Sequence, residues 1–107
     1  MPIPKDAELE REIAGLIISG FNENRINSDL ETELKNGLGG VILFRNNVGS
    51  PEAVLELTDS LREAAGDENL LIAIDHEGGR VMRLAETFTL FPPMAALGRA
   101  YDPELAR

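Results

Sequence analysis

The sequence predicts an α/β fold in which parallel strands alternate with helices. Three short, continuously apolar runs at 16–21, 41–44 and 70–74 are separated by segments with helical spacing of apolar residues. Strands that are buried on both faces are continuously apolar rather than alternating. A helix between two strands favours parallel pairing, because the crossover returns the chain to the same end of the sheet. We therefore expect three parallel strands with intervening helices.

Capping residues predict where the first two helices begin and end. Asp6 is placed to cap a helix that precedes the first apolar run. Ser28 and Glu31 have the spacing of a capping box, in which the side chain of each residue accepts a hydrogen bond from the backbone N–H of the other. Gly37 is expected to end that second helix in the left-handed conformation.

The third predicted helix has the most complete pattern. Ser50 is its expected N-cap, and Pro51 occupies the first helical position, where a missing N–H costs nothing. Gly66 ends it. Its apolar stripe has helical spacing and comprises Val54, Leu57, Leu61 and Ala64 or Ala65.

Beyond the third strand the periodicity lapses over 76–93, which predicts a long loop. A short helix is expected at 95–97, ended by Gly98, and a new helix start at 102–104. One helical turn is not stable alone, and three strands leave two open sheet edges. We therefore expect either further chain or a second copy to complete the sheet.

Composition excludes several classes of function. Lys plus Arg is 10 and Asp plus Glu is 19, so the net charge is −9, which disfavours a nucleic-acid or anionic-membrane partner. The chain has no cysteine and one histidine, so thiolate and multi-histidine metal sites are excluded within it. The apolar runs are far shorter than a membrane span of about 20 residues. Residues 1–8 lack the apolar core of a signal peptide, so we expect a cytoplasmic protein.

The segment 75–83 carries the densest chemistry. It holds two carboxylates, the only imidazole and two guanidinium groups around Gly78 and Gly79, directly after the third predicted strand. Ligands of parallel α/β proteins bind at the carboxyl ends of strands, which is where Asp75 lies. A carboxylate accepts hydrogen bonds from two adjacent hydroxyls, and the glycines allow close approach of the backbone. These features favour binding of a polyol.

Structural alternatives exist for each of these residues. Asp75 is equally suited to form a turn, and Glu77 with Arg80 favours a structural ion pair. His76 is expected to pack or to hydrogen-bond rather than to catalyse, and a metal site built on it needs water or a second chain. Asp75 and Glu77 are poorly suited as a glycosidase pair, because both approach a ligand from one side. Arg45–Asn46 fits a plain loop role at least as well as a site role.

Three segments after the third predicted strand carry a resemblance to a known family. They are Ile-Asp-His-Glu-Gly-Gly-Arg-Val-Met-Arg at 74–83, Phe-Thr at 88–89 and Phe-Pro-Pro-Met-Ala at 91–95. Together they resemble the corresponding segments of family 3 glycoside hydrolases. The similarity is to the N-terminal domain of their bacterial β-N-acetylglucosaminidase (β-N-acetylhexosaminidase) branch. Further segments similar to that branch are 17–21, 39–46, 50–52 and 100–106.

This resemblance implies that 1–107 is the N-terminal part of a (β/α)8 TIM-type barrel, ending before the fourth strand. It implies retaining exo-hydrolysis of β-linked N-acetylglucosamine, as in cell-wall muropeptide recycling, without a metal or cofactor. Asp75 would bind hydroxyls of the sugar, and Arg83 would belong to the same substrate site. The family's catalytic residues match nothing in this sequence, so we expect this chain alone to be inactive. The alternative is a non-catalytic module that binds sugar or associates with itself.

Overall fold

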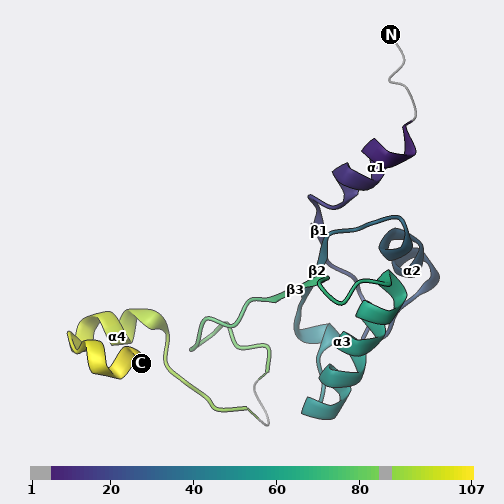
Figure 1. Cartoon of the computed structure of the whole chain (residues 1–107). Coiled ribbons are helices and arrows are strands. Elements are labelled where there is room, and N and C mark those ends of the chain that lie inside the picture. Colours follow the sequence, from purple (N-terminus) through teal and green to yellow (C-terminus); the bar gives the residue numbers. More distant parts are fainter. Residues whose placement is uncertain (1–5, 85–87) are drawn as a thin grey trace.

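The computed structural model describes residues 6–84 and 88–107, and three strands in it form one parallel sheet (Figure 1). The strands are β1 (Ile18–Ser19), β2 (Gly40–Leu43) and β3 (Leu71–Ile74), in the order β1-β2-β3. Both pairings are parallel, with Ile18 beside Gly40 and Gly40 beside Leu71. The predicted α/β class and the parallel pairing of three strands are confirmed.

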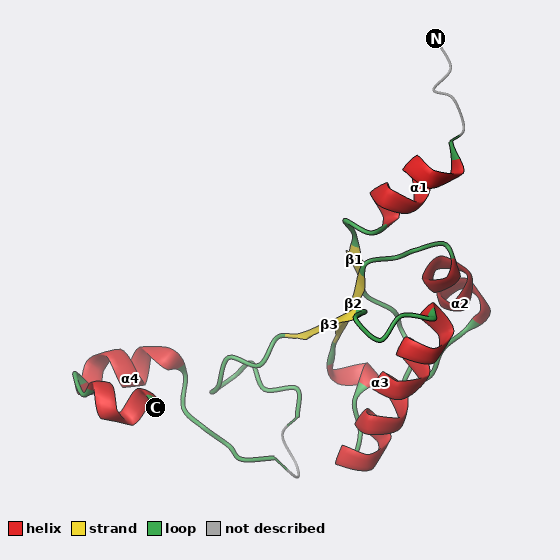
Figure 2. Ribbon diagram, in the orientation of Figure 1, coloured by secondary structure: helices red, strands yellow, loops and turns green. Residues whose placement is uncertain are grey.

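Helices connect the strands in strict alternation (Figure 2). α2 joins β1 to β2, and α3 joins β2 to β3. None of the helices in the described ranges is both long and apolar enough to cross a bilayer. The helical elements are α1 (Ala7–Ala14), α2 (Ser28–Lys35), η1 (Arg45–Asn47), α3 (Pro51–Ala65), α4 (Met94–Ala100) and η2 (Pro103–Ala106).

Most of the predicted helix ends are confirmed, but the predicted N-cap of α2 is wrong. Asp6 caps α1, Ser50 caps α3, and Gly66 ends α3 with φ of 64°. In α2, however, the N-cap is Asn27, whose Oδ1 accepts the Leu30 N–H at 2.9 Å. The amide oxygen one residue earlier reaches this N–H, and Ser28 becomes the first helical residue instead of the cap.

The hydrophobic core lies between the sheet and the helices α2 and α3. Val41 and Leu43 alternate along β2, so both point to the same face of the sheet. Ile72 and Ile74 on β3 pack against the same cluster. The buried members of the core are Leu30, Leu34, Leu38, Val41, Leu43, Leu57, Leu61 and Leu70.

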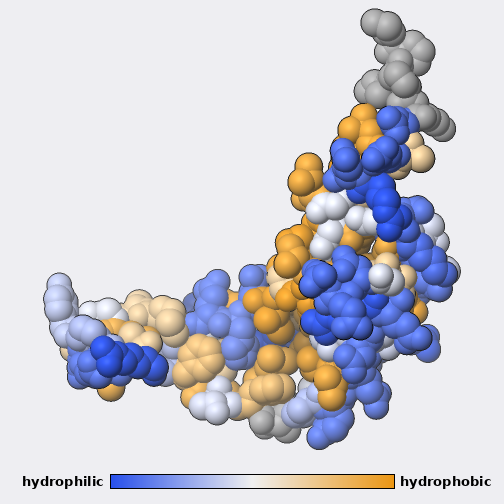
Figure 3. Space-filling view, viewed as in Figure 1, coloured by the Kyte–Doolittle hydropathy of each residue, from blue (hydrophilic) through white to orange (hydrophobic). Residues whose placement is uncertain are grey.

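The opposite face of the sheet is uncovered in the described structure. Ile18, Gly40 and Leu71 share one register row on that face, and the side chains of Ile18 and Leu71 are 47% and 60% exposed. Figure 3 shows apolar surface along this side, away from α2 and α3. The prediction that 16–21 forms a strand buried on both faces is therefore wrong. β1 is an edge strand, and the helices cover a single face.

The C-terminal segment differs from the predicted pattern at one residue. Gly98 does not end the short helix but lies inside α4, which continues to Ala100 and ends at Tyr101 with φ of 55°. A glycine inside a helix costs only about 1 kcal/mol, so it weakens α4 without terminating it. The predicted start at Asp102 is confirmed, because its side chain accepts the Glu104 N–H at 3.0 Å.

The two end helices contribute little to the core. Neither α1 nor α4 has a buried residue, and both project from the body formed by the sheet, α2 and α3 (Figure 1). The radius of gyration is 17.6 Å, whereas a fully packed domain of this length has about 13 Å. The chain therefore folds around a small core and exposes much apolar surface.

Candidate functional site

Asp75 lies directly after β3 on the uncovered side of the sheet. Side chains alternate along a strand, so Asp75 follows Leu71 and Ala73 on the face that α2 and α3 leave open. Its side chain is exposed, and within the described ranges no hydrogen bond or ion pair engages it. The carboxylate is therefore free to accept donors from a ligand.

A cavity of about 390 Å³ lies between α1, β1 and α2, where Ala14, Ser19 and Leu30 contribute to its wall. Asp75 is not among the residues that line this cavity. Its side chain is exposed at the end of β3.

A glycine turn after Asp75 brings the loop 76–83 against the segment 91–93. The Glu77 N–H donates to the Val81 carbonyl at 2.8 Å, which closes the turn. Gly78 has φ of 87°, and a Cβ there would lie 2.8 Å from the Phe91 ring. The Gly79 N–H donates to the Phe91 carbonyl at 3.0 Å. Close contact between the two segments therefore requires these glycines, as their backbone freedom predicts.

Arg83 lies on the same side of the sheet as Asp75. Its guanidinium carbon is 5.8 Å from the centre of the Phe44 ring, within range of a cation–π contact. Phe44 follows β2 on the uncovered face, two residues after Ile42. The Nε of Arg83 is buried and has no hydrogen-bond partner among the described residues. A buried unpaired N–H is costly, so an acceptor supplied by a ligand would stabilise it.

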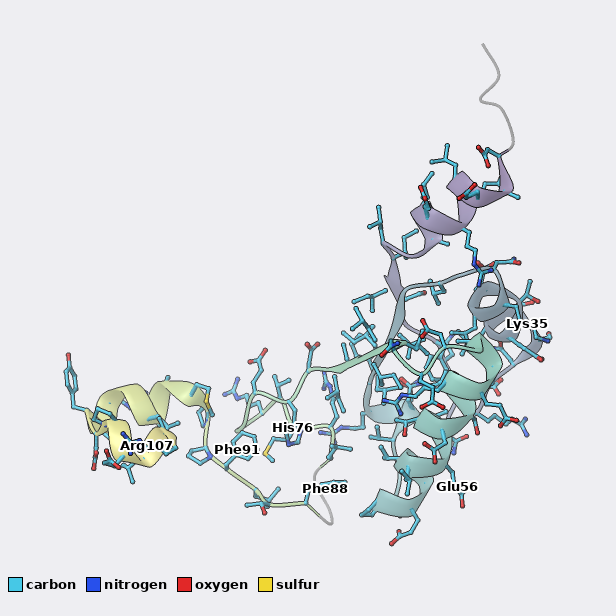
Figure 4. All side chains as sticks on the ribbon, viewed as in Figure 1. Lys35, Glu56, His76, Phe88, Phe91 and Arg107 are labelled. Atoms are coloured by element: carbon cyan, nitrogen blue, oxygen red, sulfur yellow. The ribbon has the colours of Figure 1, made fainter. Side chains whose placement is uncertain are left out.

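His76 hydrogen-bonds and packs, as the sequence predicts. Its Nδ1 accepts the backbone N–H of Arg83 at 3.2 Å. Its ring meets Phe91 edge to face, with the centroids 5.3 Å apart and an interplanar angle of 68° (Figure 4). The described residues bring no three metal-ligating side chains together, so their geometry does not favour the metal interpretation of this segment.

The predicted ion pair between Glu77 and Arg80 is wrong for the structure as described. These two side chains are both exposed, and neither forms a salt bridge with any residue that the structure describes. Water solvates both charges in this position, and an exposed pair would contribute little to stability.

Arg45 and Asn46 connect the ends of all three strands. The Nη2 of Arg45 donates to the Met82 carbonyl at 3.3 Å, in the loop after β3. The Nδ2 of Asn46 donates to the Asn22 carbonyl at 2.7 Å, in the loop after β1. These contacts agree with the loop role considered for the pair, because both side chains hydrogen-bond to the backbone of neighbouring loops.

Sequence reasoning missed the role of Asn47, whose side chain is 2% exposed and hydrogen-bonded at both its oxygen and its nitrogen. Its Nδ2 donates to the carbonyls of Phe21 at 2.8 Å and Glu23 at 2.6 Å, and its Oδ1 accepts the Phe44 N–H at 2.7 Å. Asn47 thereby fixes the loop after β1 to the end of β2. The only available hint was an asparagine at the end of a buried strand, which is typical of many ordinary turns.

Comparison with known proteins agrees with this arrangement. Residues 8–107 match the model of the glycosyl hydrolase family 3 N terminal domain. A beta-hexosaminidase of Chromobacterium violaceum is 42% identical over 93 residues, covering 87% of this chain and 24% of that protein. A beta-hexosaminidase of Methylobacillus flagellatus is 51% identical over 72 residues, covering 65% of this chain and 20% of that protein.

Solved structures give the same family. A family 3 β-N-acetylglucosaminidase from Paenibacillus sp. str. FPU-7 superposes with a TM-score of 0.85 at 37% identity, over 92% of this chain and 19% of that one. NagZ from Neisseria gonorrhoeae, solved in complex with N-trifluoroacetyl-D-glucosamine, superposes with a TM-score of 0.71 at 34% identity. That match covers 82% of this chain and 26% of NagZ.

The chain belongs to the glycosyl hydrolase family 3 N-terminal domain family. It spans about a quarter of the length of the curated relatives it matches. Its three parallel strands with intervening helices are the N-terminal portion of the TIM-type barrel that the resemblance implied. In such a barrel the helices lie outside and the strand ends carry the site, which matches the positions of α2, α3 and Asp75.

Proposed function

We propose that this chain supplies substrate-binding residues to a retaining exo-glycosidase that hydrolyses β-linked N-acetylglucosamine, with residues 1–107 forming part of its barrel domain. The catalytic nucleophile and acid/base of this proposal lie outside the 107 residues. Its cellular role would be the recycling of cell-wall muropeptides in the cytoplasm, with a carbohydrate as the only substrate partner.

Asp75 and Arg83 are the proposed substrate-binding residues. The free carboxylate of Asp75 at the end of β3 is the observation that carries this assignment, because it offers acceptors for adjacent sugar hydroxyls. Arg83 adds a buried Nε–H that has no partner within the described ranges. Its position over Phe44, on the same face, supports binding to one ligand.

Titration of the ¹⁵N-labelled chain with N-acetylglucosamine tests the binding step. We expect amide shift changes centred on 75–83, and we expect Asp75→Asn to weaken binding about tenfold or more, because a charged acceptor is lost. Glu77→Gln is the matched control, since it neutralises an exposed acid two residues away and should leave affinity unchanged. Equal loss in both variants, or shifts confined to the opposite end of the sheet, would contradict the assignment.

The reaction is tested in a chimera in which residues 8–107 replace the matching part of the Chromobacterium violaceum beta-hexosaminidase. We expect the chimera to cleave a para-nitrophenyl β-N-acetylglucosaminide. Asp75→Asn in the chimera should lower kcat/KM by about a hundredfold. The 107-residue chain alone should release no chromophore above background. Turnover by the chain alone, or an unimpaired Asp75→Asn chimera, would refute the proposal.

One observation favours a second candidate, a non-catalytic module that associates with itself. The apolar face formed around Ile18 and Leu71 is exposed in the described chain, and a second copy would bury it. Such a module could still bind sugar through Asp75, so the two candidates differ in turnover by the chimera and in oligomeric state.

A further inference from the structure

One peptide group in the loop after β3 is held at both of its ends by side chains. The carbonyl of Met82 accepts a hydrogen bond from Nη2 of Arg45 at 3.3 Å. The N–H of the next residue, Arg83, donates to Nδ1 of His76 at 3.2 Å. These two atoms belong to the same planar peptide unit. Arg45 follows β2 and His76 follows β3, so side chains from two neighbouring strand ends hydrogen-bond to this peptide group.

We call these two hydrogen bonds, from Arg45 to the Met82 carbonyl and from the Arg83 N–H to His76, the clamp. The clamp fixes the backbone position of Arg83. A peptide plane held at both its oxygen and its nitrogen cannot rotate without losing a hydrogen bond. Met82 is 5% exposed, so its side chain anchors the same plane in packed surroundings. The guanidinium of Arg83 then lies over Phe44, the residue next to Arg45. Both the backbone and the head group of Arg83 are thus located by the end of β2.

The contact also defines the state of the imidazole. A ring nitrogen that accepts an N–H bond carries a lone pair, so the proton of the neutral ring is on Nε2. The edge-to-face contact with Phe91 holds the ring plane in place. Phe91 in turn is joined to the glycine turn through the Gly79 N–H. The only histidine of the chain is therefore built into the support of Arg83.

We propose that His76 and Arg45 are positioning residues that fix the guanidinium of Arg83 for contact with the sugar. This inference rests on the proposed function, in which Arg83 contacts the substrate. It gives a role to two charged or titratable side chains that the binding step itself does not use.

Nuclear magnetic resonance of the ¹⁵N-labelled chain at about pH 8 tests the clamp without any ligand. We expect the Nε2–H tautomer of His76 and slow solvent exchange of the backbone N–H of Arg83, which donates to Nδ1 of His76. His76→Phe keeps a ring against Phe91 but removes the acceptor, and Arg45→Met removes the donor. Each should raise that exchange rate about tenfold, which corresponds to one lost hydrogen bond.

Matched variants separate the hydrogen bond from general packing. His76→Asn places an amide oxygen where Nδ1 was and should restore slow exchange. Arg80→Met removes an exposed guanidinium of the same loop and should change nothing. Methyl resonances of Leu57 and Leu61 in the core report whether each variant remains folded. An Nδ1–H tautomer in the unaltered chain would overturn the proposal, and so would equal exchange rates in His76→Phe and His76→Asn. The tautomer is measured on the unaltered chain, so it tests the proposal even if a variant unfolds.

Adding N-acetylglucosamine distinguishes failure of the clamp from failure of the proposed function. His76→Phe should weaken sugar binding about tenfold, whereas His76→Asn should bind like the unaltered chain. If the unaltered chain shows no response to sugar, the proposed binding function is refuted. The tautomer and the exchange rates still decide whether His76 and Arg45 position Arg83.

Discussion

At the scale of single residues, loss of the Asn47 side chain should destabilise the fold strongly. Its amide pairs three backbone groups from two loops in a site that is 2% exposed. Asn47→Ala leaves buried donors and acceptors unpaired, so we expect the free energy of unfolding to fall by about 3 kcal/mol. Urea denaturation followed by circular dichroism measures this change.

Asn46→Ala is the matched control for that substitution. Asn46 is exposed, and among the described residues its side chain makes one hydrogen bond, which Nδ2 donates to the Asn22 carbonyl. Water replaces the lost partner, and we expect a change below about 1 kcal/mol. Equal effects of the two substitutions would show that burial of Asn47 does not stabilise the strand ends.

These residues also show which parts of the site the sequence can predict. The location of Asp75 depends on a strand that ends one residue earlier, so the local pattern is sufficient to place it. The contacts of Asn47 join residues 24 and 26 positions apart, and the contact of Arg45 with Met82 spans 37 positions. Such pairs depend on strand register and loop path, which no local pattern specifies.

At the scale of the helix, α3 contributes two buried leucines, Leu57 and Leu61, to the core. Leu61 is 0% exposed and packs in the cluster between α2, α3 and β2. Leu61→Ala removes buried methyl groups and leaves a cavity, so we expect a loss of about 3 kcal/mol in the free energy of unfolding. Leu55→Ala, on the exposed side of α3 at 61% exposure, should change it by less than about 0.5 kcal/mol.

Thermal and urea unfolding of both variants check this difference. A Leu61→Ala chain as stable as the Leu55→Ala chain would show that α3 is not packed on the sheet as described. The comparison is direct because both substitutions truncate the same side chain in one helix, with similar effects on helix propensity.

Helix ends were predictable where the cap is local, and less so where two residues compete. Ser50 with Pro51 and Gly66 defined α3 because each satisfies or avoids an orphan backbone group by itself. At α2, Asn27 and Ser28 are both good caps, and the backbone path after β1 selects Asn27. The prediction that β1 is buried on both faces was wrong, because a run of apolar residues does not reveal whether a second layer covers the strand.

At the scale of the whole molecule, two opposing properties govern association. The sheet face around Ile18 and Leu71 is apolar and exposed, which favours burial against a second copy. The net charge of −9 opposes close approach of two chains. Salt weakens only the second effect, because the screening length falls from about 10 Å at 0.1 M to about 3 Å at 1 M.

We therefore expect the weight-average mass in sedimentation equilibrium to rise with ionic strength. Leu71→Lys places a charge in the centre of the apolar face and should keep the chain monomeric at high salt. Leu55→Lys adds the same charge on α3, away from the sheet, and should leave the salt-dependent association intact. A mass that does not change with salt would refute association through this face. Equal suppression of association by Leu71→Lys and Leu55→Lys would also refute it, because the added charge, and not its location on the sheet, would then explain the loss of association.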